Sequence, residues 1–424
     1  MSGPHVVVLG LGTAGAAVAA ACAQRGLRVT GIDAHSLDDT GAGWVNGVPA
    51  WAFDAVGLAR PQPPERLGGG TPFHLVAGWN GPRMRTTGVL EVDMRALTRR
   101  LLDLASAHRA ELRGDTRVCG VDGHDVHLVG ASEPLRAGVV VDATGLSGVG
   151  LLRQRGPRRE DLCVAAQGVF DLADRAGADA FLERHHIGEG EIVCFTGIAG
   201  GYSIINMRVH GDTVSVLTGS IPALGHPSGV QLLRMVLQEN PWIGPRRFGG
   251  SRAIPLARPL DVVGWGRAVA IGDAANMVWA PHGSGIAQQL LAADLLARTL
   301  ADGGDPWTFN VDWQRTHGAL LASADLLRRA TTALDPSWLP SMIERGVLSP
   351  ALAEDALLQR PTRPPPAAVA RAARGLLRLP AVARALGPAL ARGPLLEAHH
   401  RRYPSRPSGL TSWRARRAWI VGHG

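Results

Sequence analysis

A glycine-rich turn close to the start of the chain has the spacing of a dinucleotide-binding site. It reads Gly10-Leu11-Gly12-Thr13-Ala14-Gly15, which matches the pattern G-x-G-x-x-G. Gly10 allows a tight turn, Gly12 lets the backbone approach a pyrophosphate, and Gly15 lets the next helix pack closely on a strand. The free N–H groups where that helix begins, at Thr13 and Ala14, favour a bound phosphate because the helix dipole is positive there.

The elements predicted around this turn support a dinucleotide site. A strand at His5–Leu9 precedes the turn, an alanine-rich helix over Ala14–Arg25 follows it, and a second strand covers Leu27–Ile32. Asp33 ends this second strand. Its carboxylate, together with the adjoining Ala34, is expected to meet the adenosine ribose and accept hydrogen bonds from the hydroxyl groups.

Two later segments of the sequence also predict an apolar strand followed directly by a glycine turn. The first reads VVVDATG and places Asp142 and Gly145 at the end of its strand. The second reads AVAIGDAA and places Gly272 and Asp273 in the same way. A turn then opens a long helix, and it reads Pro281-His282-Gly283-Ser284-Gly285-Ile286.

These three motifs, in this order, resemble the FAD-dependent oxidoreductases of the p-hydroxybenzoate-hydroxylase-like superfamily. The resemblance is to the branch that contains geranylgeranyl reductases, lycopene cyclases, and flavin monooxygenases and halogenases. It implies a Rossmann-type, GR2-like FAD domain in which Asp273 holds the ribityl chain. It also implies that the Pro281–Ile286 turn lies at the pyrimidine edge of the flavin, where a helix N-terminus stabilises the negative charge of reduced flavin. Many members have a FAD-binding arginine where this chain has Met94, so Arg95 is the candidate for that contact.

Four side chains are candidates for catalysis or for contact with the substrate. His282 lies in the turn next to the flavin, and a histidine titrates near neutral pH, so it can serve as acid or base. Trp44 and Asn46 belong to a loop that is expected to cover the flavin, and Tyr202 belongs to a strand that is expected to border the substrate. No metal site is expected, because the adjacent His185 and His186 point in different directions.

The absence of lysine excludes several reaction mechanisms. All 44 basic residues are arginine, which excludes a Schiff base and removes the lysine on which flavin halogenases depend. The leading hypothesis is a monooxygenase or dehydrogenase of secondary metabolism that acts on a hydrophobic small molecule, with NAD(P)H or a partner reductase as electron donor. A geranylgeranyl-reductase-like alkene reductase, a redox-neutral lycopene-cyclase-like enzyme and a non-catalytic flavin-binding protein are the alternatives.

The hydrophobic pattern predicts an α/β fold in three parts. A discontinuous FAD-binding Rossmann domain covers residues 1–160 and 255–330, and an antiparallel β-sheet substrate domain is inserted at 161–254. Within that sheet, His210-Gly211-Asp212 predicts a hairpin. Residues 34–88 are rich in Gly, Pro and Trp and are expected to form long loops, and a basic helical region covers 335–424.

The charge of the chain is concentrated at its C-terminal end. The formal net charge is +8, yet residues 360–424 contain thirteen arginines and a single acid, Glu397. We expect helices that pack on the FAD domain with their arginines in water, interrupted by prolines such as Pro388. The alternative is peripheral contact with an anionic membrane. Nucleic acid is not an expected partner, since no recognition module or interleaved aromatic residues accompany the arginines.

Cysteine usage and hydropathy indicate the compartment. The four cysteines are widely spaced and form no C-x-x-C pair, which is typical of a reduced protein. No basic leader and no apolar run of about 20 residues is present, so a soluble, cytoplasmic protein is expected. The sequence does not predict the oligomeric state.

Overall fold

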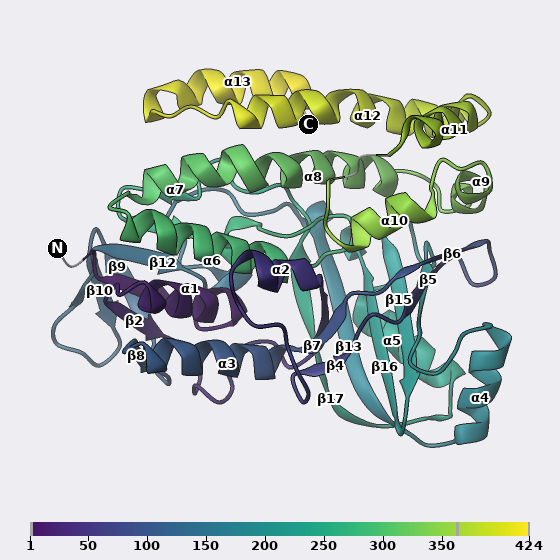
Figure 1. Cartoon of the computed structure of the whole chain (residues 1–424), viewed down its shortest axis with the longest axis horizontal. Helices are drawn as coiled ribbons and strands as arrows, with labels where there is room; N and C mark the ends of the chain where they lie inside the picture. Colours follow the sequence, from purple (N-terminus) through teal and green to yellow (C-terminus); the bar gives the residue numbers. More distant parts are fainter. Residues whose placement is uncertain (1–2, 362–363, 423–424) are drawn as a thin grey trace.

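The computed structural model describes residues 3–361 and 364–422, and a six-stranded sheet forms the centre of its first domain (Figure 1). All neighbouring strands in it are parallel except the edge pair β18–β19. In spatial order the strands are β18 (Gly264–Trp265), β19 (Ala268–Ala270), β12 (Val139–Asp142), β1 (Val6–Leu9), β2 (Val29–Ile32) and β8 (Glu111–Arg113). The central strands are apolar runs rather than alternating ones because helices and loops bury both of their faces.

Three helices pack against one another beside this sheet. α1 (Thr13–Gln24) lies between α3 (Met94–Ala107) and α6 (Ile286–Ala301). Eight of the twelve residues of α1 are alanine or glycine and the helix is buried along nearly its whole length, so its neighbours can approach its backbone closely. α7 (Pro306–Trp313) continues the layer, and α2 (Ala50–Ala55) packs on α6. The Rossmann-type domain predicted from the glycine motifs is therefore present.

A seven-stranded sheet forms the second domain. In spatial order its strands are β17 (Ile243–Pro255), β13 (Leu162–Leu172), β16 (Thr213–Ser220), β15 (Ser203–His210), β14 (Ile192–Thr196), β5 (Pro72–Ala77) and β6 (Arg83–Thr87). The predicted hairpin is confirmed, since His210 pairs with Thr213. Two helices of this domain, α4 (Arg175–Arg184) and α5 (Gly229–Glu239), pack outside the sheet (Figure 1).

The expectation that residues 34–88 form long loops is wrong. Strands β5 and β6 from this segment form one edge of the seven-stranded sheet, where β5 pairs in parallel with β14. Residues 34–88 also contribute β3 (Val45–Val48) and β4 (Arg66–Gly68), which pair with β7 (Leu90–Asp93). These strands are short and separated by Gly and Pro, which hides their alternating pattern, and only β5 has a partner far along the chain. A third small sheet consists of β9 (Val118–Asp122), β10 (Asp125–Leu128) and β11 (Leu135–Arg136).

Helices cover the top of both domains in Figure 1. They are α8 (Ala319–Thr332), α9 (Trp338–Glu344), α10 (Pro350–Leu357), α11 (Pro366–Leu377), α12 (Pro380–Arg401) and α13 (Leu410–Val421). Pro388 does not interrupt this region as expected, because Pro388 and Pro394 both lie inside α12. Both prolines are exposed, so water can bond the carbonyl groups that the missing N–H groups leave free. In the described part of the chain no helix combines the length and the apolar character needed to cross a bilayer.

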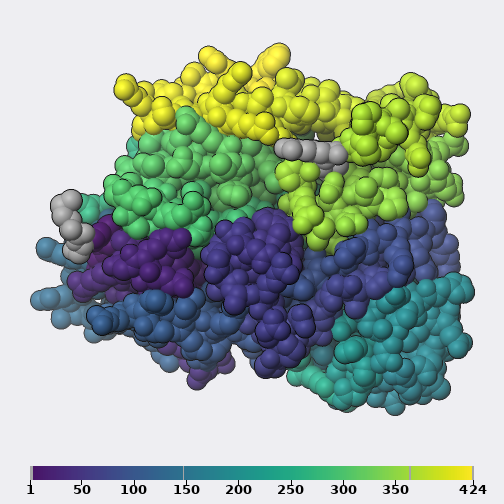
Figure 2. Space-filling view, viewed as in Figure 1, coloured from purple at the N-terminus to yellow at the C-terminus, as the bar shows by residue number. Residues whose placement is uncertain are grey.

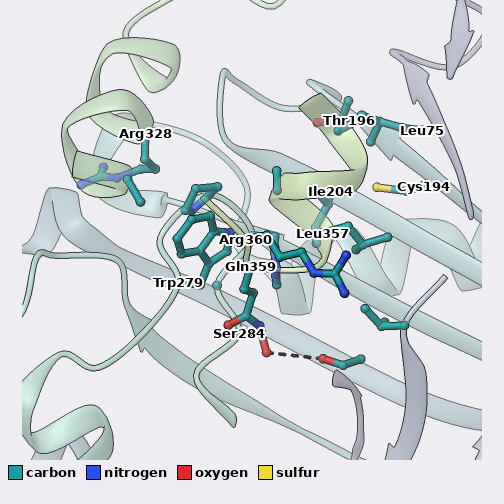
Figure 3. Close-up of a pocket in the computed structure, with 18 of the residues that line it drawn as sticks. Leu75, Cys194, Thr196, Ile204, Trp279, Ser284, Arg328, Leu357, Gln359 and Arg360 are labelled. Carbon is teal, nitrogen blue, oxygen red and sulfur yellow. Dashed lines mark hydrogen bonds between the residues drawn. The ribbon is translucent and has the colours of Figure 1, made fainter. Parts of the chain in front are cut away.

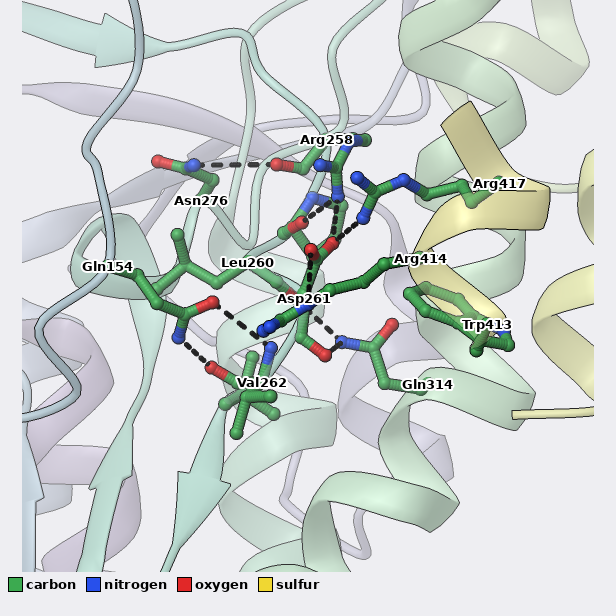
Figure 4. A network of polar contacts seen from close by, with 12 residues as sticks. Gln154, Arg258, Leu260, Asp261, Val262, Asn276, Gln314, Trp413, Arg414 and Arg417 are labelled. Carbon is green, nitrogen blue, oxygen red and sulfur yellow. Dashed lines mark hydrogen bonds and ion pairs between the residues drawn. The ribbon is translucent and has the colours of Figure 1, made fainter. Parts of the chain in front are cut away.

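The last helix is attached to the Rossmann-type domain through one carboxylate (Figure 4). Asp261 accepts hydrogen bonds from Arg258 at 2.6 Å, from Arg414 at 3.1 Å and from Arg417. Burial alone would raise the pKa of Asp261, but the charges of Arg258 and Arg417 outweigh it and lower the pKa to about 2. The arginines of α13 thus fix the helical layer to the domain below. Contact of this layer with an anionic membrane stays a prediction.

Candidate functional site

The glycine turn after β1 leaves bare backbone at the start of α1. A Cβ on Gly10 would lie 2.7 Å from the Ala143 carbonyl oxygen, and one on Gly15 would lie 1.8 Å from the Gly10 oxygen. Side chains are therefore excluded at both positions. Gly12 differs, because a Cβ there would meet no atom within 4 Å and would project into open space. The backbone at Gly12 is thus free to approach a ligand.

Asp33 holds this turn in place. Its Oδ2 accepts the Leu11 N–H at 2.6 Å, and its Oδ1 accepts the His35 N–H at 2.9 Å. Both carboxylate oxygens thus already have protein donors, and the predicted ribose contact would use their remaining lone pairs. Ala34 is exposed beside it. The ribose contact stays a prediction for both residues.

A small pocket joins the three predicted motifs. Its volume is about 100 Å³. The predicted cofactor residues that line it are Gly12, Thr13, Ala14, Gly145, Asp273, Gly283, Ser284, Gly285 and Ile286. Segments that are more than 250 residues apart in sequence therefore meet around one space, as the order of the motifs predicts.

Four other predicted cofactor residues lie behind the pocket wall or beside it. Asp142 accepts the Thr144 N–H, the Thr144 hydroxyl and the Gly150 N–H, so it closes its own loop rather than facing the pocket. Gly272 has a φ of +72°, and a Cβ there would lie 2.9 Å from the Ala14 Cβ, so it brings its turn against α1. Pro281 lines a neighbouring cavity instead. Arg95 is exposed, with its guanidinium 5.6 Å from the centre of the Phe248 ring, and does not line the pocket.

Among the residues of this pocket that sequence reasoning missed, two are polar, Arg252 and Gln289. Arg252 is on β17 of the second domain and faces Asp273. Burial raises the pKa of Asp273, and the positive charge of Arg252 opposes that rise. No motif marks Arg252, since it lies in a strand of the other domain. Gln289 belongs to the first turn of α6, where the helical spacing after Gly285 could have indicated it.

Two helices begin at the pocket without a side-chain cap. α1 begins after Gly12 and α6 begins after Gly285, and neither N-terminus has a side-chain hydrogen bond. Side chains cap α3, α4, α5, α7 and α10, and these are Asp93, Asp174, Ser228, Asp305 and Ser349. Among the residues that the structure describes, the helices α2, α8, α9, α11, α12 and α13 lack a side-chain cap, as α1 and α6 do, so it is the position of α1 and α6 at the pocket that distinguishes them. The first N–H groups of a helix have no partner within the helix, so those of α1 and α6 are available to an anionic or polar ligand in the pocket.

A much larger cavity, of about 1070 Å³, adjoins this pocket. It lies between the seven-stranded sheet and the helices α8, α10 and α12, and its wall is mainly apolar (Figure 3). The predicted substrate residues Trp44, Asn46 and Tyr202 all line it. Trp44, Asn46, Ile254, Gly283 and Ser284 line both spaces, so they form a shared wall.

Ionisable side chains also border the large cavity. Glu91 and Arg208 form a buried ion pair in its wall, and burial raises the pKa of Glu91 although Arg208 opposes it. His282 lines the cavity as well, but the expectation that it titrates near neutral pH is wrong. Burial lowers the pKa of His282 to about 4, even though the carbonyls of Ala356 and Leu357 act in the opposite direction. The ring is therefore neutral at pH 7.

Comparison with known proteins agrees with this architecture. No family model matches the sequence, and no curated protein sequence matches it. A geranylgeranyl bacteriochlorophyll reductase-like protein from Thermoplasma acidophilum has a similar structure, with a TM-score of 0.71, 14% identity, and coverage of 92% of this chain and 100% of that one. A probable FAD-dependent monooxygenase from Pseudomonas aeruginosa matches with a TM-score of 0.57 and 18% identity, over 78% of this chain and 97% of that one.

A halogenase variant solved in complex with FAD also matches, with a TM-score of 0.59 and 14% identity, over 99% of this chain and 95% of that one. At such low identity the likeness concerns the fold. The chain thus has the fold of the FAD-dependent oxidoreductases that its three glycine motifs resemble.

Proposed function

We propose that this protein is an FAD-dependent oxidoreductase that acts on a hydrophobic small molecule. The observation that carries the proposal is the shared wall of Trp44, Asn46, Ile254, Gly283 and Ser284. On one side of it lies a pocket of bare backbone and helix N-termini, and on the other a large apolar cavity. An enzyme that transfers electrons between a bound cofactor and an apolar substrate requires two such sites in contact.

The residues of the small pocket fit FAD. The open space at Gly12 and the uncapped start of α1 suit a pyrophosphate, which needs close backbone approach and N–H donors. Asp273 and Arg252 line the same pocket, and Asp273 would hold the ribityl chain. Gly283, Ser284 and Gly285 would meet the flavin ring where α6 begins. The flavin, when bound, accepts and delivers electrons, and the protein positions it and excludes water.

Monooxygenation or dehydrogenation is the reaction we favour. The large cavity can hold a substrate away from water, and oxygenation needs no dedicated acid among the side chains. NAD(P)H or a partner reductase would supply electrons. The likeness to a probable FAD-dependent monooxygenase supports this choice, and the lack of lysine counts against halogenation.

Alkene reduction is the second candidate. The geranylgeranyl reductase-like protein aligns over its whole length, and a large, mainly apolar cavity suits a prenyl chain. A redox-neutral cyclisation is less well supported, because it needs an acid beside the substrate. His282, with a pKa of about 4, is not protonated at neutral pH, and Glu91, whose pKa burial raises, is engaged in the ion pair with Arg208.

The cofactor and the reaction are tested in two steps. Purified protein should be yellow and release FAD on denaturation, and protein that is colourless and cannot be reconstituted with FAD would contradict the proposal. The flavin is then reduced anaerobically with NAD(P)H and exposed to air in the presence of candidate substrates. Product that carries oxygen favours the monooxygenase, whereas substrate turnover without oxygen favours the alkene reductase.

A further inference from the structure

Polar atoms without partners gather at one place in the wall of the large cavity. Among the described residues, Trp279 Nε1, His282 Nε2, Gln288 Oε1 and Gln359 Nε2 are buried and have no hydrogen-bond partner. All four residues line the cavity. Buried polar groups in native proteins nearly always have a partner, because leaving one unpaired is unfavourable. Four such atoms in one wall indicate that a polar group of a ligand belongs there.

These four residues come from adjoining elements. Trp279 pairs with Ser284 across the turn that precedes α6, and Gln288 lies in the first turn of α6. Gln288 donates to the Gln359 side-chain oxygen at 3.4 Å, which joins that turn to the end of α10. Figure 3 shows Trp279 and Gln359 in the same part of the wall as Ser284, one of the residues shared with the small pocket.

Gln359 is held in a conformation that does not suit glutamine. It follows α10 with a φ of +54°, and the next residue, Arg360, donates its N–H to the Asp355 carbonyl at 2.9 Å. This is the helix ending in which glycine is usual, because a Cβ is unfavourable in the left-handed region. Trp51 fixes the segment by donating to the Leu358 carbonyl at 2.8 Å. Strain at a buried side chain that borders a cavity is typical of a functional position.

The unpaired atoms specify the ligand group. The Trp279 N–H can only donate, and the Gln359 amide nitrogen donates as well. The four residues of the set are neutral, and N–H donors without a charge suit a neutral carbonyl oxygen better than a buried carboxylate. Of the arginines in the same part of the cavity wall, Arg328 is already paired with Asp161 and Asp325. Arg360 lines the cavity as well but is exposed.

We propose that Trp279 and Gln359 bind a carbonyl oxygen of an otherwise apolar substrate. The proposal assigns a class of substrate to the cavity. It rests on the proposed function only in taking the bound molecule to be the substrate of the enzyme.

The test compares 9-fluorenone with fluorene, which share a ring system and differ by one carbonyl group. Equilibrium dialysis against the full-length protein should show fluorenone bound about tenfold more tightly than fluorene, the effect of one to two hydrogen bonds. In Gln359→Leu the preference should fall to about threefold, because the Trp279 N–H still donates to the carbonyl. The infrared carbonyl stretch of bound fluorenone should lie at lower wavenumber in the wild type than in this variant.

A second variant separates binding from folding. Gln359→Gly removes the same donor but suits the backbone, so it should reduce the preference for fluorenone as much as Gln359→Leu does and yet unfold at a higher temperature than the wild type. Asn206→Leu, which removes a different amide from the cavity, should leave the ratio of the two affinities unchanged. Equal binding of fluorenone and fluorene to the wild type, or tighter binding of fluorene-9-carboxylate than of fluorenone, would overturn the proposal. FAD content is measured separately, so failure here is distinct from failure to bind the cofactor.

Discussion

The two adjoining pockets are built from different parts of the chain and from different kinds of atom. The small pocket presents mainly backbone, from the starts of α1 and α6 and from glycine turns that follow β1 and β12. The large cavity presents mainly side chains, which come from the seven-stranded sheet and from α8, α10 and α12. A backbone site can bind the same cofactor in many proteins, whereas a cavity of side chains can change its ligand by substitution. This difference explains why the cofactor is easier to infer than the substrate.

The largest effect is expected from Gly12→Val, which fills the backbone pocket. The side chain would project into the open space at Gly12, so FAD should no longer bind while the domain remains folded. Flavin absorbance after gel filtration and circular dichroism measure the two outcomes. Gly120→Val is a matched control, because a Cβ there also meets open space but lies on β9, away from both pockets. Retained flavin in Gly12→Val would mean that the pyrophosphate lies elsewhere.

A large side chain introduced into the cavity should weaken binding of an apolar ligand and leave FAD binding intact. Ile204 lines only the large cavity, so Ile204→Trp should weaken binding of an apolar dye such as N-phenyl-1-naphthylamine roughly tenfold, since overpacking costs about 1–3 kcal/mol. FAD content should stay at the wild-type level. Ile204→Leu keeps the volume and serves as control. Loss of FAD from Ile204→Trp would show that the two pockets are not independent.

A smaller effect is expected from Asp261→Asn, which loosens the helical layer above the cavity. The pKa of Asp261 is about 2 against an ordinary 3.8, a difference that corresponds to about 2 kcal/mol of stability. Because the folded-state pKa is lowered, this contribution is present above about pH 4 and is lost as the pH falls toward 2. Urea unfolding of the wild type and the variant at pH 7 and pH 3 measures it.

The variant should be less stable at pH 7, and the difference should shrink at pH 3. Dye binding in the cavity should weaken more than FAD binding, because α13 is attached through Asp261. Asp294→Asn is the control, since Asp294 also pairs with two arginines, Arg25 and Arg298, but lies on α6. Equal loss of both ligands in Asp261→Asn would contradict this assignment.

The smallest effect concerns His282, which lines the large cavity. Its pKa of about 4 lies below the ordinary 6.5, so the neutral ring favours the folded state above pH 6.5, and this contribution is lost as the pH falls toward 4. His282→Gln should therefore reduce the fall in melting temperature between pH 6.5 and pH 5. The fall should not vanish, since burial also lowers the pKa of His317 to about 4 and that of His400 to about 3. The exposed His108→Gln should behave like the wild type.

The difference between the backbone pocket and the side-chain cavity also separates the features that could be predicted from the sequence from those that could not. The glycine turns, β1, α1, β12 and α6 were predictable because steric limits on backbone act within a few residues. Asp33 and Asp142 were identified as important, but the structure shows their oxygens accepting N–H groups of the protein. The strands of residues 34–88 were missed because they are short and interrupted by Gly and Pro, and because β5 joins its sheet through β14, which lies more than 100 residues away. Arg252 and Gln359 were missed because neither belongs to a local motif.

The sequence by itself determined the backbone conformation at the small pocket, because only glycine tolerates the close contacts at Gly10 and Gly15. The sequence also excluded every mechanism that needs a lysine. The tertiary structure alone decided the large cavity and its polar wall. Trp279, Gln288 and Gln359 become neighbours only when α10 packs on the turn before α6. A local sequence pattern predicts the backbone conformation of its own segment, whereas a site made of side chains forms from segments that meet only after folding.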